Sequence, residues 1–150
     1  MIFKGIRNQF LELKIIGYEL PENFGPSYEA NFLVIELNVA SDLGNWQTDG
    51  CALSTTDVEK IIDWFYKLGE HKSQTQQLSF MEKGISFELI NNNTVQKQVR
   101  ALLYSECLPQ NAVEGKQYYV DLDLNHLELK EVSESLQKEL NLFPSRGFEE

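Results

Sequence analysis

The chain has 150 residues, of which 42% are hydrophobic and 11% aromatic, and its 13 Lys and Arg against 23 Asp and Glu give a net charge of −10. This composition excludes a disordered chain, and the length predicts a single domain over residues 1–150 with a substantial core. The negative charge argues against direct binding to nucleic acid or to an anionic membrane, because both need clustered Lys and Arg. It favours a basic partner instead.

The lack of a recognisable targeting signal and the cysteine usage predict a cytoplasmic protein. The N-terminal sequence Met-Ile-Phe-Lys-Gly-Ile-Arg lacks the long apolar stretch of a signal peptide, and no window approaches the roughly 18 apolar residues of a membrane span. The two cysteines, Cys51 and Cys107, could form one disulfide, but nothing marks a secreted disulfide framework. We therefore expect reduced thiols, with Cys51 as a small buried residue of a strand.

Alternating apolar and polar residues predict four strands in the first part of the chain. They cover residues 2–6, 9–16, 31–39 and 46–53, with a turn at Asn8 and another at residues 41–45. Between the second and third strands, residues 17–29 form a predicted loop that contains Pro21, Gly25 and Pro26. We expect this loop to cover a sheet edge.

A middle helix follows the fourth strand. Thr56 and Glu59 fit a capping box, in which each side chain bonds the backbone amide of the other residue. Gly69 is placed to end the helix. The apolar residues recur at helical spacing behind the cap and are Val58, Ile61, Ile62, Phe65 and Leu68.

The second half of the chain predicts four more strands and a final helix. Residues 78–82 and 84–90 form a predicted hairpin around Lys83-Gly84, and further strands cover residues 94–104 and 116–124, separated by a loop at residues 109–115. Asn125 and Glu128 can cap a C-terminal helix whose apolar stripe runs over residues 129–143 and which Pro144 ends. Residues 146–150 are expected to fray.

These elements predict an α+β fold with a mainly antiparallel β-sheet, one middle helix and one C-terminal helix. The connections between strands have hairpin length, which disfavours parallel crossover units. We expect a curved sheet or a two-sheet sandwich packed by both helices.

The sequence offers little chemistry for an enzyme. It lacks a phosphate-binding glycine loop, a nucleophile elbow and cysteine or histidine pairs at zinc-ligand spacing. Its two histidines, His71 and His126, are interpreted as surface residues beside helix ends. We therefore predict no catalytic residues, no bound metal and no cofactor.

One acidic and aromatic strip is a candidate surface for a protein partner. Period-two spacing places Tyr119, Asp121 and Asp123 on one strand face, with the two carboxylates about 7 Å apart. Aromatic side chains can act as interface anchors, and carboxylates can meet Arg or Lys of a partner. Trp64, off the centre of its helix stripe, is either half-buried or a further anchor. A solvated strand face and, less favoured, an acidic metal site are the alternatives for the two aspartates.

Several segments resemble one known family. Residues 17–21 (Gly-Tyr-Glu-Leu-Pro), 30–34 (Ala-Asn-Phe-Leu-Val), 44–46 (Gly-Asn-Trp) and 51–55 (Cys-Ala-Leu-Ser-Thr), before a helix that contains Trp64-Phe65, resemble WapI-family immunity proteins. The chain departs from the family pattern at Phe32, where Trp is usual, and at Ala52-Leu53-Ser54, where Leu-Leu-Thr is usual. The resemblance spans residues 17 to about 125. Its motifs are structural, so it carries no binding residues over to this chain.

The resemblance implies an immunity protein that binds and inhibits a cognate toxin. The expected partner is the toxin's C-terminal domain, a basic nuclease whose nucleic-acid site the acidic protein would mask. The alternative hypothesis is a small-ligand or carbohydrate-binding β-sandwich accessory protein. A third, an enzyme that uses Asp121 and Asp123 with a divalent metal, lacks a third ligand at useful spacing.

Overall fold

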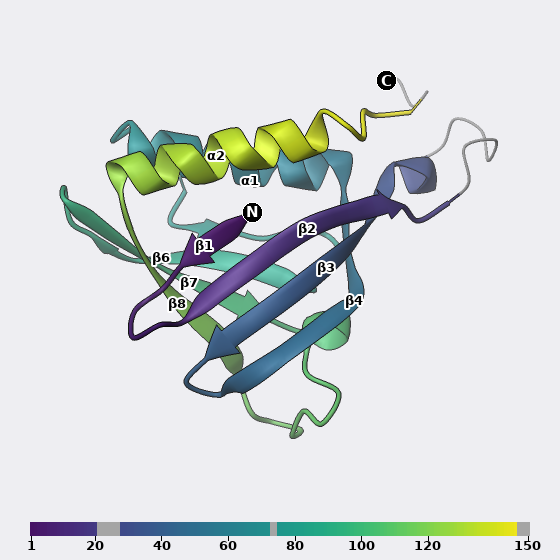
Figure 1. Ribbon diagram of the computed structural model, residues 1–150, viewed down its shortest axis with the longest axis horizontal. Coiled ribbons are helices and arrows are strands. Elements are labelled where there is room, and N and C mark those ends of the chain that lie inside the picture. Colours follow the sequence, from purple (N-terminus) through teal and green to yellow (C-terminus); the bar gives the residue numbers. More distant parts are fainter. Residues whose placement is uncertain (21–27, 73–74, 147–150) are drawn as a thin grey trace.

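The computed structural model describes residues 1–20, 28–72 and 75–146, and its strands form two antiparallel sheets (Figure 1). The first sheet has the order β1 (Ile2–Lys4), β2 (Phe10–Tyr18), β3 (Phe32–Ser41), β4 (Gly44–Ser54). The second has the order β5 (Gln77–Leu78), β6 (Ile85–Asn92), β7 (Gln96–Leu103), β8 (Tyr118–Asn125). The predicted antiparallel α+β class is therefore confirmed, in its two-sheet form.

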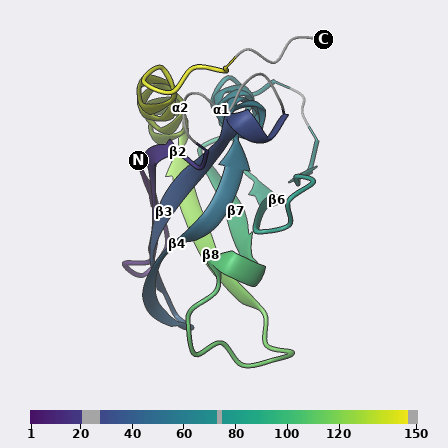
Figure 2. The ribbon, with the colours of Figure 1, turned by 90° about the vertical axis from the view of Figure 1, so that its right-hand side faces the viewer.

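The two sheets face each other and enclose the core between them (Figure 2). Alternate residues of β2 and β3 point into this space from one sheet, and alternate residues of β6 and β8 do so from the other. Phe3 and Phe87 both pack against Phe65 in this core, with ring centroids 5.1 and 5.2 Å from the Phe65 ring. Burial of such large aromatic rings supplies much of the hydrophobic stabilisation of a core.

Different contacts join the sheets along their two sides. On one side the chain after β1 pairs with β8 through a bridge between Gly5 and Leu122, and the Ile6 amide donates to the Asp121 carbonyl at 3.1 Å. On the other side a disulfide connects Cys51 of β4 to Cys107 of the short 3-10 helix η3 (Ser105–Cys107). The expectation of reduced thiols was wrong. The fold brings two residues separated by 56 positions to a Cα–Cα distance of 4.9 Å, which the sequence pattern does not reveal.

Two helices lie side by side across one end of the sheets (Figures 1 and 2). Helix α1 (Thr55–Gly69) begins two residues earlier than predicted, because Ser54 and Asp57 form its capping box in place of Thr56 and Glu59. The Ser54-x-x-Asp57 spacing fits the same motif, and the end of β4 places Ser54 at the cap. Helix α2 (His126–Leu140) has the predicted capping box of Asn125 and Glu128.

The end of α1 also differs from the prediction. Gly69 is the last residue of α1 and lies against α2, where a Cβ atom would come within 3.2 Å of Lys130 Cγ and 3.3 Å of the His126 carbonyl oxygen. Its role is therefore close helix packing, and the left-handed residue after the helix is His71, with φ of 58°. Helix α2 ends at Leu140, three residues before the predicted end.

Other boundaries refine the predictions. Strand β2 extends to Tyr18, a 3-10 helix η2 (Tyr28–Asn31) precedes β3, and β5 has two residues where five were expected. Pro21, Gly25 and Pro26 of the predicted loop lie outside the described residues. Arg146 was expected to fray, but its guanidinium donates to the carbonyls of Leu20 and Ala30. None of the helices in the described ranges is long and apolar enough to span a membrane.

Candidate functional site

The predicted partner-binding residues of β8 lie on the outer face of the second sheet. Tyr119, Asp121 and Asp123 are half-buried and alternate with residues that point into the core, as the period-two pattern predicts. We call these three residues the β8 strip. Strand β7 lies beside the strip, and its register sets Gln98 opposite Asp123 and Arg100 opposite Asp121.

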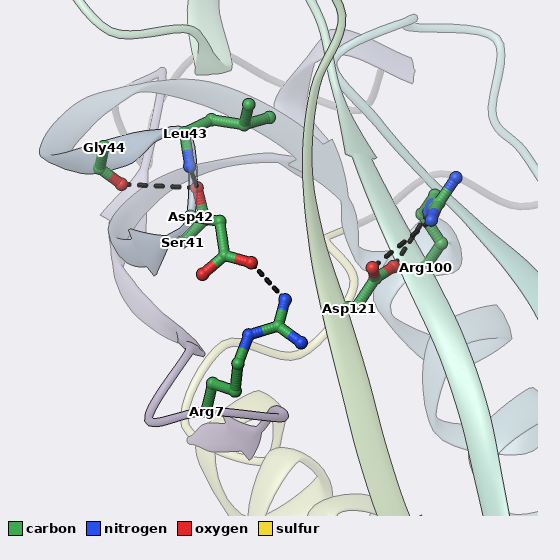
Figure 3. A network of polar contacts seen from close by, with 7 residues as sticks. All are labelled: Arg7, Ser41, Asp42, Leu43, Gly44, Arg100 and Asp121. Carbon is green, nitrogen blue, oxygen red and sulfur yellow. Dashed lines mark hydrogen bonds and ion pairs between the residues drawn. The ribbon is translucent and has the colours of Figure 1, made fainter.

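Asp121 is neutralised within the sheet by Arg100 (Figure 3). Arg100 Nε donates to Asp121 Oδ1 at 2.8 Å and its Nη2 donates to Oδ2 at 3.2 Å, a two-bond geometry typical of strong Arg–carboxylate pairs. Donation of these hydrogen bonds to Asp121, together with the negative charge of that carboxylate, raises the pKa of Arg100. The same guanidinium lies 4.1 Å from the ring centroid of Tyr119, in a cation–π contact. The strip is therefore less acidic than its sequence suggests.

A second cation lies near the strip (Figure 3). The tight turn after β1 is built on Arg7 and Asn8, both with positive φ, which confirms the predicted turn at Asn8. The Arg7 guanidinium donates to Asp42 in the β3–β4 turn, and this contact raises the pKa of Arg7, with a smaller contribution from Asp121. Ser41 holds that turn by accepting from the Leu43 amide at 3.0 Å.

Asp123 differs from Asp121 because it forms no ion pair with any of the described residues. Its Oδ1 atom is buried and has no hydrogen-bond partner among the described residues, and the same holds for Nε2 of Gln9. A buried acceptor without a donor costs about 1–3 kcal/mol. Within the described part of the chain, no group of three or more His, Cys, Asp and Glu residues is arranged to hold a metal ion.

Trp64 lies in the core and not on the surface. It is 3% exposed, and its ring packs against Phe65 and Phe87 at centroid distances of 5.2 and 6.3 Å. Its indole Nε1 donates to the Thr75 carbonyl at 2.9 Å, because the chain leading into β5 covers this side of α1. The interpretation of Trp64 as an exposed anchor therefore needs correction.

Local sequence patterns do not reveal the arginine that pairs with the strip, Arg100, or the arginine that lies near it, Arg7. Arg100 shares the outward parity of β7, so its face is predictable, but its position opposite Asp121 depends on which strand pairs with β8 and in which register. Arg7 comes near Asp42 only through the folding of two hairpin turns, 35 residues apart. The histidines, His71 and His126, are exposed as expected.

Comparison with known families places this chain in one class of proteins, the immunity proteins. The family model described as "Immunity protein WapI-like family" matches residues 1–144. The chain therefore belongs to the WapI-like immunity protein family, as the resemblance of its motifs predicted. The comparison with curated proteins gave no match.

Proposed function

We propose that this immunity protein binds the C-terminal domain of a cognate nuclease toxin in the cytoplasm and blocks its nucleic-acid site. The observation that carries the proposal is the family match over residues 1–144, since an immunity protein implies a toxin partner. The protein acts by occupying a surface, without a catalytic step of its own.

Charge supports a nuclease as the target. A nuclease must present Lys and Arg to hold the phosphates of its substrate. An inhibitor with net charge −10 can imitate those phosphates and be steered towards the same surface. We expect a one-to-one complex that buries about 1,600 Å² and has a dissociation constant of about 1 nM or below.

We propose that the β8 strip forms part of this interface with the toxin. Tyr119 presents an aromatic edge, and a basic group of the toxin would compete with Arg100 for Asp121 or approach Asp123. Exchange of one cation for another changes affinity little, because the existing pair must open first. Trp64 contributes from beneath, by fixing α1 on the core.

Co-expression tests the proposal. The toxin C-terminal domain encoded beside this gene is expressed with and without the immunity protein, and growth, co-purification and degradation of RNA and DNA are measured. We expect rescue of growth, a complex that weakens as salt is raised, and loss of nuclease activity in the complex.

Two results would contradict parts of the proposal. Rescue without any nuclease activity of the free toxin would retain the immunity role and remove the nuclease target. Absence of rescue and of a complex would remove the immunity role for this toxin. The immunity protein expressed with a toxin domain whose active site is mutated provides the control for expression level.

A further inference from the structure

A concave surface lies beside the end of β4 that leads into α1. Two adjoining hollows, of about 320 and 150 Å³, share Ala52 and Glu82 in their walls. The first is also lined by Glu19, Glu29 and Phe32, and the second by Lys83 and Glu106. We call this continuous surface the acidic trough.

The described walls of the trough carry a net negative charge. Its four glutamates, Glu19, Glu29, Glu82 and Glu106, are all exposed, and Lys83 is the one cation in its described walls. Among the described residues, none of these four carboxylates accepts a hydrogen bond or forms an ion pair. Converging charges of one sign over an apolar floor of Phe32 and Ala52 produce a strong local potential.

Arg146 fixes one end of the trough. Its Nη2 donates at 2.8 Å to the carbonyls of both Leu20 and Ala30, which are the neighbours of Glu19 and Glu29 in the chain. The Arg146 guanidinium also lies 3.8 Å from the centroid of the Tyr18 ring. The amide of Glu19 donates to the Phe32 carbonyl at 2.9 Å. These bonds hold both glutamates beside β3 and limit the entropy that binding would cost.

The disulfide fixes the other end. Cys107 is bonded to Cys51 of β4, and Thr48 Oγ1 donates to the carbonyl of Glu106 at 3.1 Å. Gly84 lies directly against this bridge, where a Cβ atom would come within 2.8 Å of Cys107 Sγ. The lack of a side chain at Gly84 therefore lets the segment that carries Glu82 pack closely beside η3.

The groove between α1 and α2 is larger, about 580 Å³, but its charges are better balanced. Of its acidic residues, Asp63 is paired with Lys67 at 2.9 Å, and Lys138 lines the same groove. A basic partner thus gains less there than in the acidic trough.

We propose that the acidic trough is the main docking site for a basic segment of the toxin domain. Arg or Lys side chains of that segment reach the four glutamates, and an apolar side chain between them contacts Phe32 and Ala52. This inference rests on the proposed function, because it takes the toxin as the partner. The acidic trough then contributes more to recognition of the toxin domain than the β8 strip does.

Association kinetics with the toxin domain provide the first test. The double variant Glu82→Gln/Glu106→Gln removes two charges from the trough, and Glu114→Gln/Glu131→Gln removes two exposed charges elsewhere as the matched control. We expect the trough variant to lower the association rate constant about ten-fold at low salt and the control to change it much less. Unchanged melting temperatures would show that both variants fold.

A second arm does not depend on the toxin. Fluorescence anisotropy of a labelled hexa-arginine peptide measures whether a basic segment binds this chain, and at which surface. We expect the trough variant to weaken peptide binding at least five-fold more than the control variant does.

The outcomes separate the inference from the proposed function. If wild-type protein neutralises the toxin while the trough and control variants behave alike in both assays, the docking site is refuted and the immunity function stands. If wild-type protein neither protects cells nor binds the toxin, the proposed function fails, and the peptide assay still decides whether the trough accepts a basic segment.

Discussion

The β8 strip and the acidic trough present the same kind of side chain in opposite electrostatic settings. In the strip, Asp121 is satisfied by Arg100 of the neighbouring strand. In the trough, four glutamates converge without a described partner, and the bonds that order the site involve the backbone around them. A carboxylate that is already paired contributes mainly to its own sheet, whereas an unpaired one is available to a second protein.

Removal of the disulfide should have the largest effect, because it frees one end of the acidic trough and leaves the Arg100–Asp121 pair of the strip in place. The variant Cys51→Ser/Cys107→Ser should lower the free energy of unfolding by about 2–4 kcal/mol, because the bridge closes a long loop between positions separated by 56 residues. Urea denaturation measures the loss. Toxin association should slow in the same variant, since η3 and Glu106 are no longer fixed beside β4.

The control for this experiment is wild-type protein under reducing conditions, which should behave as the double variant does. Equal stability of the variant and the oxidised wild type would show that the two thiols are not bridged. Mass spectrometry after alkylation without reduction gives the thiol state directly, and it also bears on the compartment, since structural disulfides are rare in the cytosol.

Arg146→Ala should disturb the other end of the trough. The guanidinium donates to two carbonyls that no other side chain among the described residues bonds, so its loss should cost about 1–3 kcal/mol of stability. Hydrogen exchange at the Glu19 amide should accelerate, whereas amides of β8 should keep their protection. Lys138→Ala, which removes an exposed cation from the helix groove, is the control. Equal acceleration in both variants would refute a local role for Arg146.

Arg100→Ala should make the strip resemble the trough, because it leaves the Asp121 carboxylate without its cation. Loss of the two-bond pair should lower the free energy of unfolding by about 1 kcal/mol, a modest value because both partners are partly exposed. The uncovered Asp121 should increase the association rate with a basic toxin. A double-mutant cycle with Asp121→Asn measures the coupling, and additive effects on stability would contradict the pairing.

Local sequence patterns predicted much of the β8 strip and nothing of the acidic trough, for one physical reason. The parity of β8 shows that Asp121 and Asp123 share a face, because alternation is a property of neighbouring residues. The pairing of Asp121 with Arg100 depends on strand register. The trough combines positions 19, 29, 82 and 106, which only the folded chain brings together.

The remaining differences in the fold also arise where contacts between distant segments decide the structure. The capping motif of α2 was predicted at the correct residues, whereas α1 offered two overlapping motifs and the end of β4 selected Ser54. Trp64 was misplaced because helical periodicity does not show that the chain leading into β5 covers that side of the helix. The disulfide escaped prediction because cysteine spacing does not encode the approach of β4 to η3.

Asp123→Asn should give the smallest effect, and its sign distinguishes the two aspartates of the strip. The buried Oδ1 of Asp123 has no donor among the described residues, so replacing the charge by a neutral amide lowers the cost of burial. We expect unchanged stability or a gain of up to about 1 kcal/mol in urea denaturation, whereas Asp121→Asn should lose about 1 kcal/mol with its arginine pair. A loss in Asp123→Asn equal to that in Asp121→Asn would show that Asp123 is held by a donor in solution. The strip would then be compensated along its whole length, and the contrast with the acidic trough would be complete.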